Sequence, residues 1–330
     1  MRLVAYTLDG GPMRSGAFLD SDRSVIDLAS GFEAVYGESS PHLTSIQAMT
    51  EAPELALEQA AAVIGKAPAG AIHALSAVHL KAPIQPPAQM RDLSCFELHL
   101  KQSFAAARRF SVRKAADPEA AYAAADTSLE DQVIATFKRQ PIYYKANRFA
   151  VIGNDDDFIW PRYCRALDFE LEWGCYIGRP GKDIAAADAA AHIFGYTIFN
   201  DFTARDAQAR EMSGQLGPAK GKDFDTANVM GPCLVTPDEL GDPYDLDMIC
   251  RVNGEEWGRG STGDMGWRFE DAIAHVSQSE TLHSGEFLGS GTVGNGSGLE
   301  RGMTYLKPGD IVELEVAKIG VLRTVVNGPA

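Results

Sequence analysis

The chain has 330 residues, of which 45% are hydrophobic and 23% are charged. These proportions are typical of a globular protein with one large domain and a small appendage, and they exclude a fibrous or disordered chain. The net charge of −15 and the lack of any run of Lys and Arg argue against a nucleic-acid partner and against binding to an anionic membrane.

The five cysteines are odd in number and include no CxxC pair. This favours free thiols in a reducing compartment over a disulfide framework or a zinc site. The first residues do not resemble a signal peptide, and no apolar stretch reaches the roughly 18–20 residues that cross a bilayer. We therefore expect a cytoplasmic protein with no membrane partner.

Residues 1–80 are predicted to form a small N-terminal α/β module, with strands at 2–8, 15–20 and 24–29 and a helix at 49–67. A proline-rich stretch then sets the boundary near residue 80, so that residues 81–330 form the catalytic domain. Residues 93–116 are expected to be helical, and the chain beyond about residue 140 alternates strands with Gly-rich turns. The fold class is thus α+β and β-rich, with peripheral helices.

The segment 167–178, LDFELEWGCYIG, is the most informative stretch of the sequence. Side chains alternate between faces in a strand, so Asp168, Glu170 and Glu172 share the face opposite Leu167, Phe169, Leu171 and Trp173. Carboxylates side by side repel one another unless solvent or a cation relieves them. The segment therefore indicates either a site for a hard, oxygen-bound divalent ion or an ordinary solvent-exposed strand face.

Further polar residues follow in the segment 198–226. Asp201 ends a predicted strand, where loops carry function. Arg205 and Asp206 are expected to form a structural ion pair, and Gln208 is either a surface residue or a substrate contact. Lys222 lies in the turn GPAKGKDFDT, which is either a flexible surface turn or a device that places a lysine against a developing anionic oxygen.

Asp92 and His99 are seven residues apart. On a helix this spacing is two turns, so we expect both side chains on one side of it. A histidine beside a metal-bound water can serve as a general base, although a lone histidine is more often structural. The Gly-rich loop at 289–298 is either a simple turn or a cradle of backbone amides for a carboxylate.

Taken together, these segments resemble the fumarylacetoacetate hydrolase family over roughly residues 85–325. The matching pieces occur in the family's order: Asp92 to His99, LDFELEWGCYIGRPGKDI, HIFGYTIFNDFTARDAQ, GPAKGKDFDT, VNGE, GSGTVG and LKPGDIVELEVAKIGVLRTVV. The resemblance implies a mixed β-roll catalytic domain, a small N-terminal module and a homodimer.

The resemblance also implies a site. The metal, Mg²⁺ with Ca²⁺ or Mn²⁺ as alternatives, would be held by Asp92, Glu170, Glu172 and Asp201. His99 would be the base that activates water, and Lys222 and Gln208 would lie near the oxyanion. Arg108, Tyr144 and Thr292 match positions that contact carboxylate or carbonyl groups of the substrate.

Two positions depart from the family pattern, and a third has no clear counterpart. Gln102 stands where one branch has a glutamate that forms a dyad with the histidine, and Ser94 stands where the family has a tyrosine. A second branch orients the histidine with a distant glutamate, and Glu300 is a guess for this residue that we keep outside the predicted site.

The resemblance implies hydrolysis of a C–C bond in a β-diketone or 2,4-dioxo acid, such as an acylpyruvate. The alternative is a lyase or isomerase, such as a decarboxylase, hydratase or tautomerase, acting on a 2-oxo acid at the same metal. A non-catalytic metal-binding protein is the third hypothesis, and the presence of all four predicted ligands argues against it.

Overall fold

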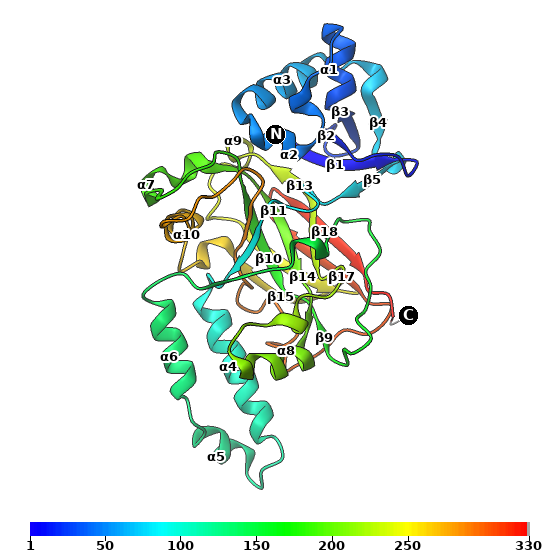
Figure 1. Ribbon diagram of the computed structural model, residues 1–330. Helices are drawn as coiled ribbons and strands as arrows, with labels where there is room; N and C mark the ends of the chain where they lie inside the picture. The colour runs from blue at the N-terminus through cyan, green and yellow to red at the C-terminus, as the bar shows by residue number, and fades with distance from the viewer. Residues whose placement is uncertain (329–330) are drawn as a thin grey trace.

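The computed structural model describes residues 1–328. Its largest sheet is mixed and contains strands from both the N-terminal region and the catalytic region (Figure 1). Its twelve strands run in the order β4 (Ile72–Ala74), β3 (Ser24–Asp27), β2 (Arg14–Leu19), β1 (Arg2–Leu8), β13 (Asn228–Val235), β11 (Ile193–Asp201), β10 (Leu171–Ile177), β16 (Phe287–Gly289), β6 (Met90–Leu93) and β7 (Tyr143–Lys145), while β5 (Val78–Lys81) pairs with β1 and β8 (Val151–Ile152) with β13. The mixed α+β class is therefore confirmed.

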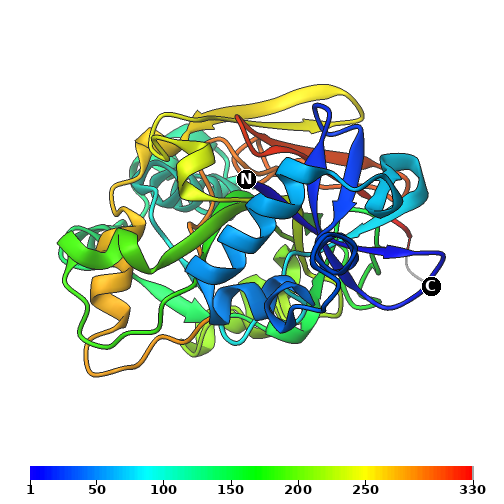
Figure 2. The ribbon, with the colours of Figure 1, turned by 90° about the horizontal axis from the view of Figure 1, so that it is seen from above.

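The N-terminal region carries three α-helices, which lie at one end of the molecule (Figures 1 and 2). They are α1 (Leu28–Tyr36), α2 (Ile46–Glu51) and α3 (Pro53–Lys66). The single helix expected at 49–67 is wrong, because Ala52 leaves the helical conformation and Pro53 starts α3 at its first position. The region is tied to the rest of the chain by the antiparallel pairing of β1 with β13.

A second, four-stranded antiparallel sheet packs against the large one. Its strands run in the order β15 (Glu255–Ser261), β14 (Asp247–Val252), β17 (Ile311–Val316) and β18 (Gly320–Val325). Along β17 every second residue is buried, as expected for a strand with one face on a core. Trp173 of β10 and Leu314 of β17 belong to the same buried apolar cluster, so the core between the sheets supports the central strands.

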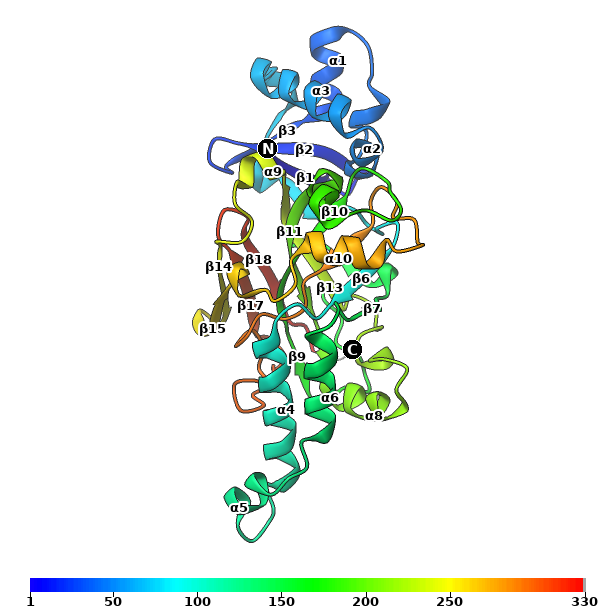
Figure 3. The ribbon, with the colours of Figure 1, turned by 90° about the vertical axis from the view of Figure 1, so that its left-hand side faces the viewer.

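A helical extension protrudes from the catalytic region (Figures 1 and 3). It consists of α4 (Glu97–Val112), α5 (Pro118–Ala123) and α6 (Ser128–Phe137). The helix expected at 93–116 therefore starts later than predicted, because residues up to Leu93 pair with β7 as the strand β6. Arg108 of α4 reaches Glu130 of α6 at 2.8 Å and Tyr122 of α5 at 2.9 Å, which ties the three helices together.

Shorter elements complete the fold. They are the two-stranded ladder of β9 (Leu167–Asp168) and β12 (Thr203–Ala204) and the helices α7 (Ala186–Ala189), α8 (Arg205–Glu211), α9 (Pro237–Leu240) and α10 (Phe269–Val276). The described part of the chain also contains 3₁₀ turns at Pro41–Leu43, Ala69–Ala71, Leu75–Ala77, Arg148–Ala150, Ala190–His192, Met212–Gly214, Ala219–Gly221 and Thr262–Asp264. Within residues 1–328, none of the helices has the length and apolar character needed to span a bilayer. The five cysteines are free and buried.

Candidate metal and catalytic site

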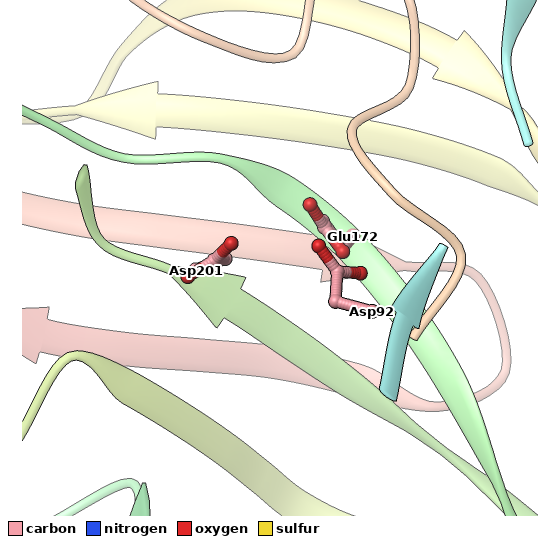
Figure 4. A group of neighbouring side chains, drawn as sticks. All are labelled: Asp92, Glu172 and Asp201. Carbon is pink, nitrogen blue, oxygen red and sulfur yellow. The ribbon is translucent and has the colours of Figure 1, made fainter. Parts of the chain in front are cut away.

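Three strands of the large sheet bring three carboxylates together. Asp92 comes from β6, Glu172 from β10 and Asp201 from the end of β11, and one oxygen of each lies within 4.8 Å of the others (Figure 4). β10 pairs with β11 on one side and with β16 on the other, and β6 pairs with β16. At Gly289 of β16 an added Cβ would lie 2.6 Å from Oδ1 of Asp92, so glycine leaves room for this carboxylate.

Burial makes the three carboxylates hard to ionise together. Burial, reinforced by the charge of Asp201, raises the pKa of Asp92 to about 7. Burial also raises the pKa of Asp201 to about 6, although Lys222 opposes the shift. Burial and the charge of Asp92 raise the pKa of Glu172 well above its usual range. Three buried carboxylates that ionise without a counter-charge destabilise the folded protein, so a bound cation would balance their negative charge.

The donor set fits a hard divalent cation. Oε2 of Glu172 and Oδ1 of Asp201 are buried and find no hydrogen-bond partner among the described residues. Buried polar atoms are nearly always satisfied, and each exception needs an explanation. Carboxylate oxygens are the ligands that Mg²⁺, Mn²⁺ and Ca²⁺ prefer, so Asp92, Glu172 and Asp201 are the residues that would hold such an ion.

Glu170, the fourth predicted ligand, is placed differently from the other three. Lys222 Nζ contacts its Oε2, and Arg205 Nη1 lies 2.7 Å from its Oε1. Although burial opposes it, the two cations lower the pKa of Glu170 to about 2. Lys222 also contacts the carboxylate of Asp201, so the lysine sits between a predicted ligand and one member of the triad. Metal binding by Glu170 stays a prediction.

His99 is held by a partner from the far end of the chain. Its Nδ1 lies 2.8 Å from Oε1 of Glu300, and Ser103 Oγ lies 3.3 Å from its Nε2. Glu300 is itself fixed, because its Oε2 accepts a hydrogen bond of 3.1 Å from the backbone N–H of Ser297. A carboxylate on Nδ1 selects the tautomer whose Nε2 can accept a proton. Ser297, whose N–H donates to Glu300, also forms an isolated β-bridge with Glu170, so the His99–Glu300 pair is connected through the backbone to the acidic residues.

The predicted substrate residues fall into two groups. Tyr144 donates to Oδ2 of Asp201 at 2.9 Å, Thr292 donates to Glu172 at 3.3 Å, and Gln208 accepts from Arg205 at 3.1 Å. These three therefore contact residues of the site directly. Arg108, in contrast, is engaged within the helical extension by Glu130 and Tyr122. A substrate role for each of the four stays a prediction.

Two expectations about local structure are wrong. Asp92 and His99 do not share a helix, because Asp92 lies in β6 and His99 in the first turn of α4. Arg205 does not pair with Asp206; it contacts Asp168 and Glu170 instead. Adjacent residues on a helix point in different directions, so the pair of neighbours in sequence is separated in space.

Sequence reasoning left out residues that the structure places at the site. Glu300 lies outside the predicted site because nothing in the sequence measures its distance to His99. The strand pattern groups Asp168 with Glu170 and Glu172, whereas the buried side chain of Asp168 lies 2.8 Å from Nη2 of Arg205. Gln102 forms two hydrogen bonds with Asn295, of 2.7 and 3.0 Å, rather than contacting the histidine. The backbone N–H of Gly291 donates to Asp92 at 3.2 Å, so one amide of the Gly-rich loop bonds a carboxylate of the candidate site.

The chain is similar in sequence to proteins of known activity. A human mitochondrial oxaloacetate tautomerase is 38% identical over 184 residues, which are 56% of this chain and 58% of the relative. The chain thus spans little more than half the length of that relative.

Two solved structures share the fold. A fumarylacetoacetate hydrolase from Exiguobacterium antarcticum superposes with a TM-score of 0.71 at 23% identity, covering 99% of both chains. Maleylpyruvate hydrolase from Sphingobium, solved with manganese(II) and pyruvate, has a TM-score of 0.70 at 20% identity and covers 100% of both chains. The model of the fumarylacetoacetate hydrolase C-terminal domain matches residues 114–327. This chain belongs to the fumarylacetoacetate hydrolase family.

Proposed function

We propose that this protein is a divalent-metal-dependent tautomerase of short 2-oxo dicarboxylic acids of the oxaloacetate type. The observation that carries the proposal is the hydrogen-bonded His99–Glu300 pair, which Ser297 links to Glu170, in the same chain as the buried triad of Asp92, Glu172 and Asp201. The relative named an oxaloacetate tautomerase supports this choice of substrate class.

In this proposal one set of residues binds the metal and the substrate, and His99 transfers one proton. When bound, Mg²⁺ or Mn²⁺ would supply Lewis-acid polarisation of a carbonyl and charge for a carboxylate. In the enol-to-keto direction, Nε2 of protonated His99 gives a proton to the substrate carbon. The C=C electron pair forms the new C–H bond, the enol O–H bond breaks and its electron pair becomes part of the C=O bond, and the released proton passes to water. Water then returns a proton to Nε2 of His99, so the net change is a shift of one proton from oxygen to carbon and no oxidant is needed. Glu300 stabilises the imidazolium on the Nδ1 side.

Lys222 and Tyr144 complete the proposed site. The Asp201 and Glu170 carboxylates, against the effect of burial, raise the pKa of Lys222, so the ammonium keeps its charge. A fixed positive charge in a buried site stabilises an enolate oxygen without reorganising. The Tyr144 hydroxyl, which donates to Asp201, orients that carboxylate.

C–C hydrolysis of an acylpyruvate is the second candidate, and the His99–Glu300 pair favours it as well. The same Nε2 atom can accept a proton from water, which would then attack a carbonyl. The two reactions differ in product. Tautomerisation leaves the carbon skeleton intact, whereas hydrolysis releases two acids.

The deciding experiment measures both reactions on one metal-loaded preparation. Loss of the ultraviolet absorbance of enol-oxaloacetate is followed beside cleavage of an acylpyruvate panel, with pyruvate release measured separately. We expect metal-dependent ketonisation that exceeds the protein-free rate and stops with EDTA. Pyruvate release from an acylpyruvate without accelerated ketonisation would replace the tautomerase proposal with the hydrolase one.

Two further expectations belong to the proposal. Small keto acids or diketones are the proposed partners, and a homodimer is expected from the family resemblance. The cytoplasm is the proposed location, because all five thiols are free and a reducing compartment keeps them so.

A further inference from the structure

Asp168 is a buried carboxylate whose oxygens accept from several parts of the chain. Oδ1 accepts from the backbone N–H of Gly298 at 2.8 Å and from that of Phe169 at 2.9 Å. Oδ2 accepts from the backbone N–H of Leu299 at 3.0 Å and from Nε of Arg205 at 2.9 Å. The side chain is fully buried, so each of these bonds is made away from bulk water.

These bonds connect Asp168 both to Glu170 and to the turn that contains Glu300. Through Arg205, Asp168 reaches Glu170, whose Oε1 is 2.7 Å from Nη1 of the same guanidinium. Through the backbone of Gly298 and Leu299, it holds the turn at residues 298–302, which contains Glu300. The contacts of Glu300 with His99 therefore depend on a turn that Asp168 fixes in place.

We infer that Asp168 is a positioning residue, which holds Glu300 against His99 while it keeps Arg205 on Glu170. The inference rests on the proposed function in one respect, namely that His99 moves the proton. Asp168 acts through its neighbours, since both of its oxygens are occupied by protein donors.

An ion pair between Asp168 and Arg205 alone does not explain why the backbone of the turn at residues 298–299 also donates to Asp168. The guanidinium contacts only Oδ2, whereas Oδ1 is directed at the backbone of Gly298. A Cβ added at Gly298 would lie 2.7 Å from Oδ1 of Asp168 and 2.0 Å from the carbonyl oxygen of Thr304. Glycine is thus required for the turn to approach the carboxylate this closely.

The test is Asp168→Asn in the full-length, Mn²⁺-loaded protein. The amide keeps the size of the side chain but turns an NH₂ donor toward the donors that faced Oδ2. We expect kcat to fall about 10- to 100-fold, as for other residues that orient a ligand or base, with a much smaller change in KM. Mn²⁺ affinity, measured by electron paramagnetic resonance, should be nearly unchanged, because Asp92, Glu172 and Asp201 are untouched.

A second readout is independent of turnover. The metal-free protein is labelled with ¹⁵N-histidine, and the Nδ1–H proton of His99 is assigned among the seven histidines by its loss in His99→Gln. Hydrogen bonding to Glu300 shifts this resonance downfield. We expect Asp168→Asn to move or broaden it as Glu300→Gln does. Wild-type kcat, or reduced kcat with an unchanged His99 resonance, would overturn the inference.

Asp27→Asn is the matched control. Asp27 is also a buried carboxylate, and it accepts from Arg14 at 2.9 Å, Tyr6 at 2.8 Å and the backbone N–H of Ser30 at 2.8 Å, but in the N-terminal region. This variant should lose stability and keep both kcat and the His99 resonance.

Gly298→Ala keeps the inference testable if Asp168→Asn does not fold. Its added Cβ should push the turn away from Asp168 and displace the His99 resonance, and an unperturbed resonance would count against the inference. If the wild-type protein turns over neither proposed substrate, the proposed function fails, whereas the resonance still reports on Asp168.

Discussion

Nδ1 of His99 lies 2.8 Å from Oε1 of Glu300, although the two residues are 201 positions apart. The contact joins the first turn of α4 to the turn after the Gly-rich loop. Glu300→Gln should therefore lower kcat, because the amide cannot stabilise the imidazolium as a carboxylate does. Removal of the base itself by His99→Ala should cost about 10²- to 10⁴-fold in kcat, and Glu300→Gln should cost less. Steady-state kinetics on enol-oxaloacetate check both, and wild-type kcat in Glu300→Gln would contradict a role for the pair.

Glu172→Ala should abolish metal binding, because the Glu172 carboxylate is a member of the triad and its Oε2 has no other partner among the described residues. A ligand that binds only the folded state raises the unfolding temperature. Mn²⁺ should therefore raise the unfolding temperature of the wild type and leave that of the variant unchanged. Glu58→Ala, at an exposed position of α3, is the control and should respond as the wild type does. An equal Mn²⁺ response in Glu172→Ala would exclude Glu172 as a ligand.

The metal-free protein should become less stable as pH rises. The folded pKa of Asp92 is about 7 and that of Asp201 about 6, against an ordinary value of 3.8. Between these values the folded state binds more protons than the unfolded state, so the stability present below about pH 4 is lost as pH rises to about 7. Urea unfolding in EDTA at pH 5 and pH 8 measures the change.

Asp92→Asn isolates the contribution of the cluster to this pH dependence. The variant cannot ionise at this position, so its free energy of unfolding should fall less between pH 5 and pH 8 than that of the wild type. Metal should reverse the trend in the wild type, because it binds the ionised carboxylates and releases protons. Identical pH slopes for wild type and variant would show that Asp92 ionises normally.

Gly289→Ala should weaken metal binding. The added Cβ would lie 2.6 Å from Oδ1 of Asp92 and 3.3 Å from the ring of Phe199, so it forces the carboxylate or the strand to move. Overpacking of this kind costs about 1–3 kcal/mol in the free energy of unfolding. Mn²⁺ titration and urea unfolding give the two effects.

Gly65→Ala provides the matched comparison for Gly289→Ala. Gly65 lies in α3, and a Cβ there meets nothing within 4 Å. An alanine in this helix should stabilise the protein by about 0.5–1 kcal/mol and leave Mn²⁺ affinity unchanged. If Gly289→Ala behaved in the same way, the space around Asp92 would not be limiting.

The sequence is most informative about the candidate site where a strand pattern and carboxylate side chains occur together. Alternation along 167–178 placed Glu170 and Glu172 on the face opposite Trp173, and the structure buries that apolar face in the core. The end of a strand marked Asp201. Both expectations depend on the two-residue period of a strand and on where strands end, which are local properties that a sequence carries.

Contacts between residues far apart in the chain could not be predicted from the sequence. Residues 90–93 pair with β16 and β7, and this pairing overrides the helical pattern that runs through the following residues. The partner of Arg205 is Asp168, brought near by the short ladder of β9 and β12. Glu300 is placed by a turn, and no periodicity reports the distance between a turn and a helix on the other side of the site.

The most direct test of the central claim is proton exchange at the substrate carbon. Oxaloacetate is incubated in D₂O with the Mn²⁺-free, Mg²⁺-loaded protein, and loss of the methylene proton signal is followed by ¹H NMR against a mixture with Mg²⁺ alone. The account predicts exchange well above that background, its loss with EDTA, and its loss in His99→Ala. Exchange equal to the protein-free rate, or full exchange in His99→Ala, would contradict it.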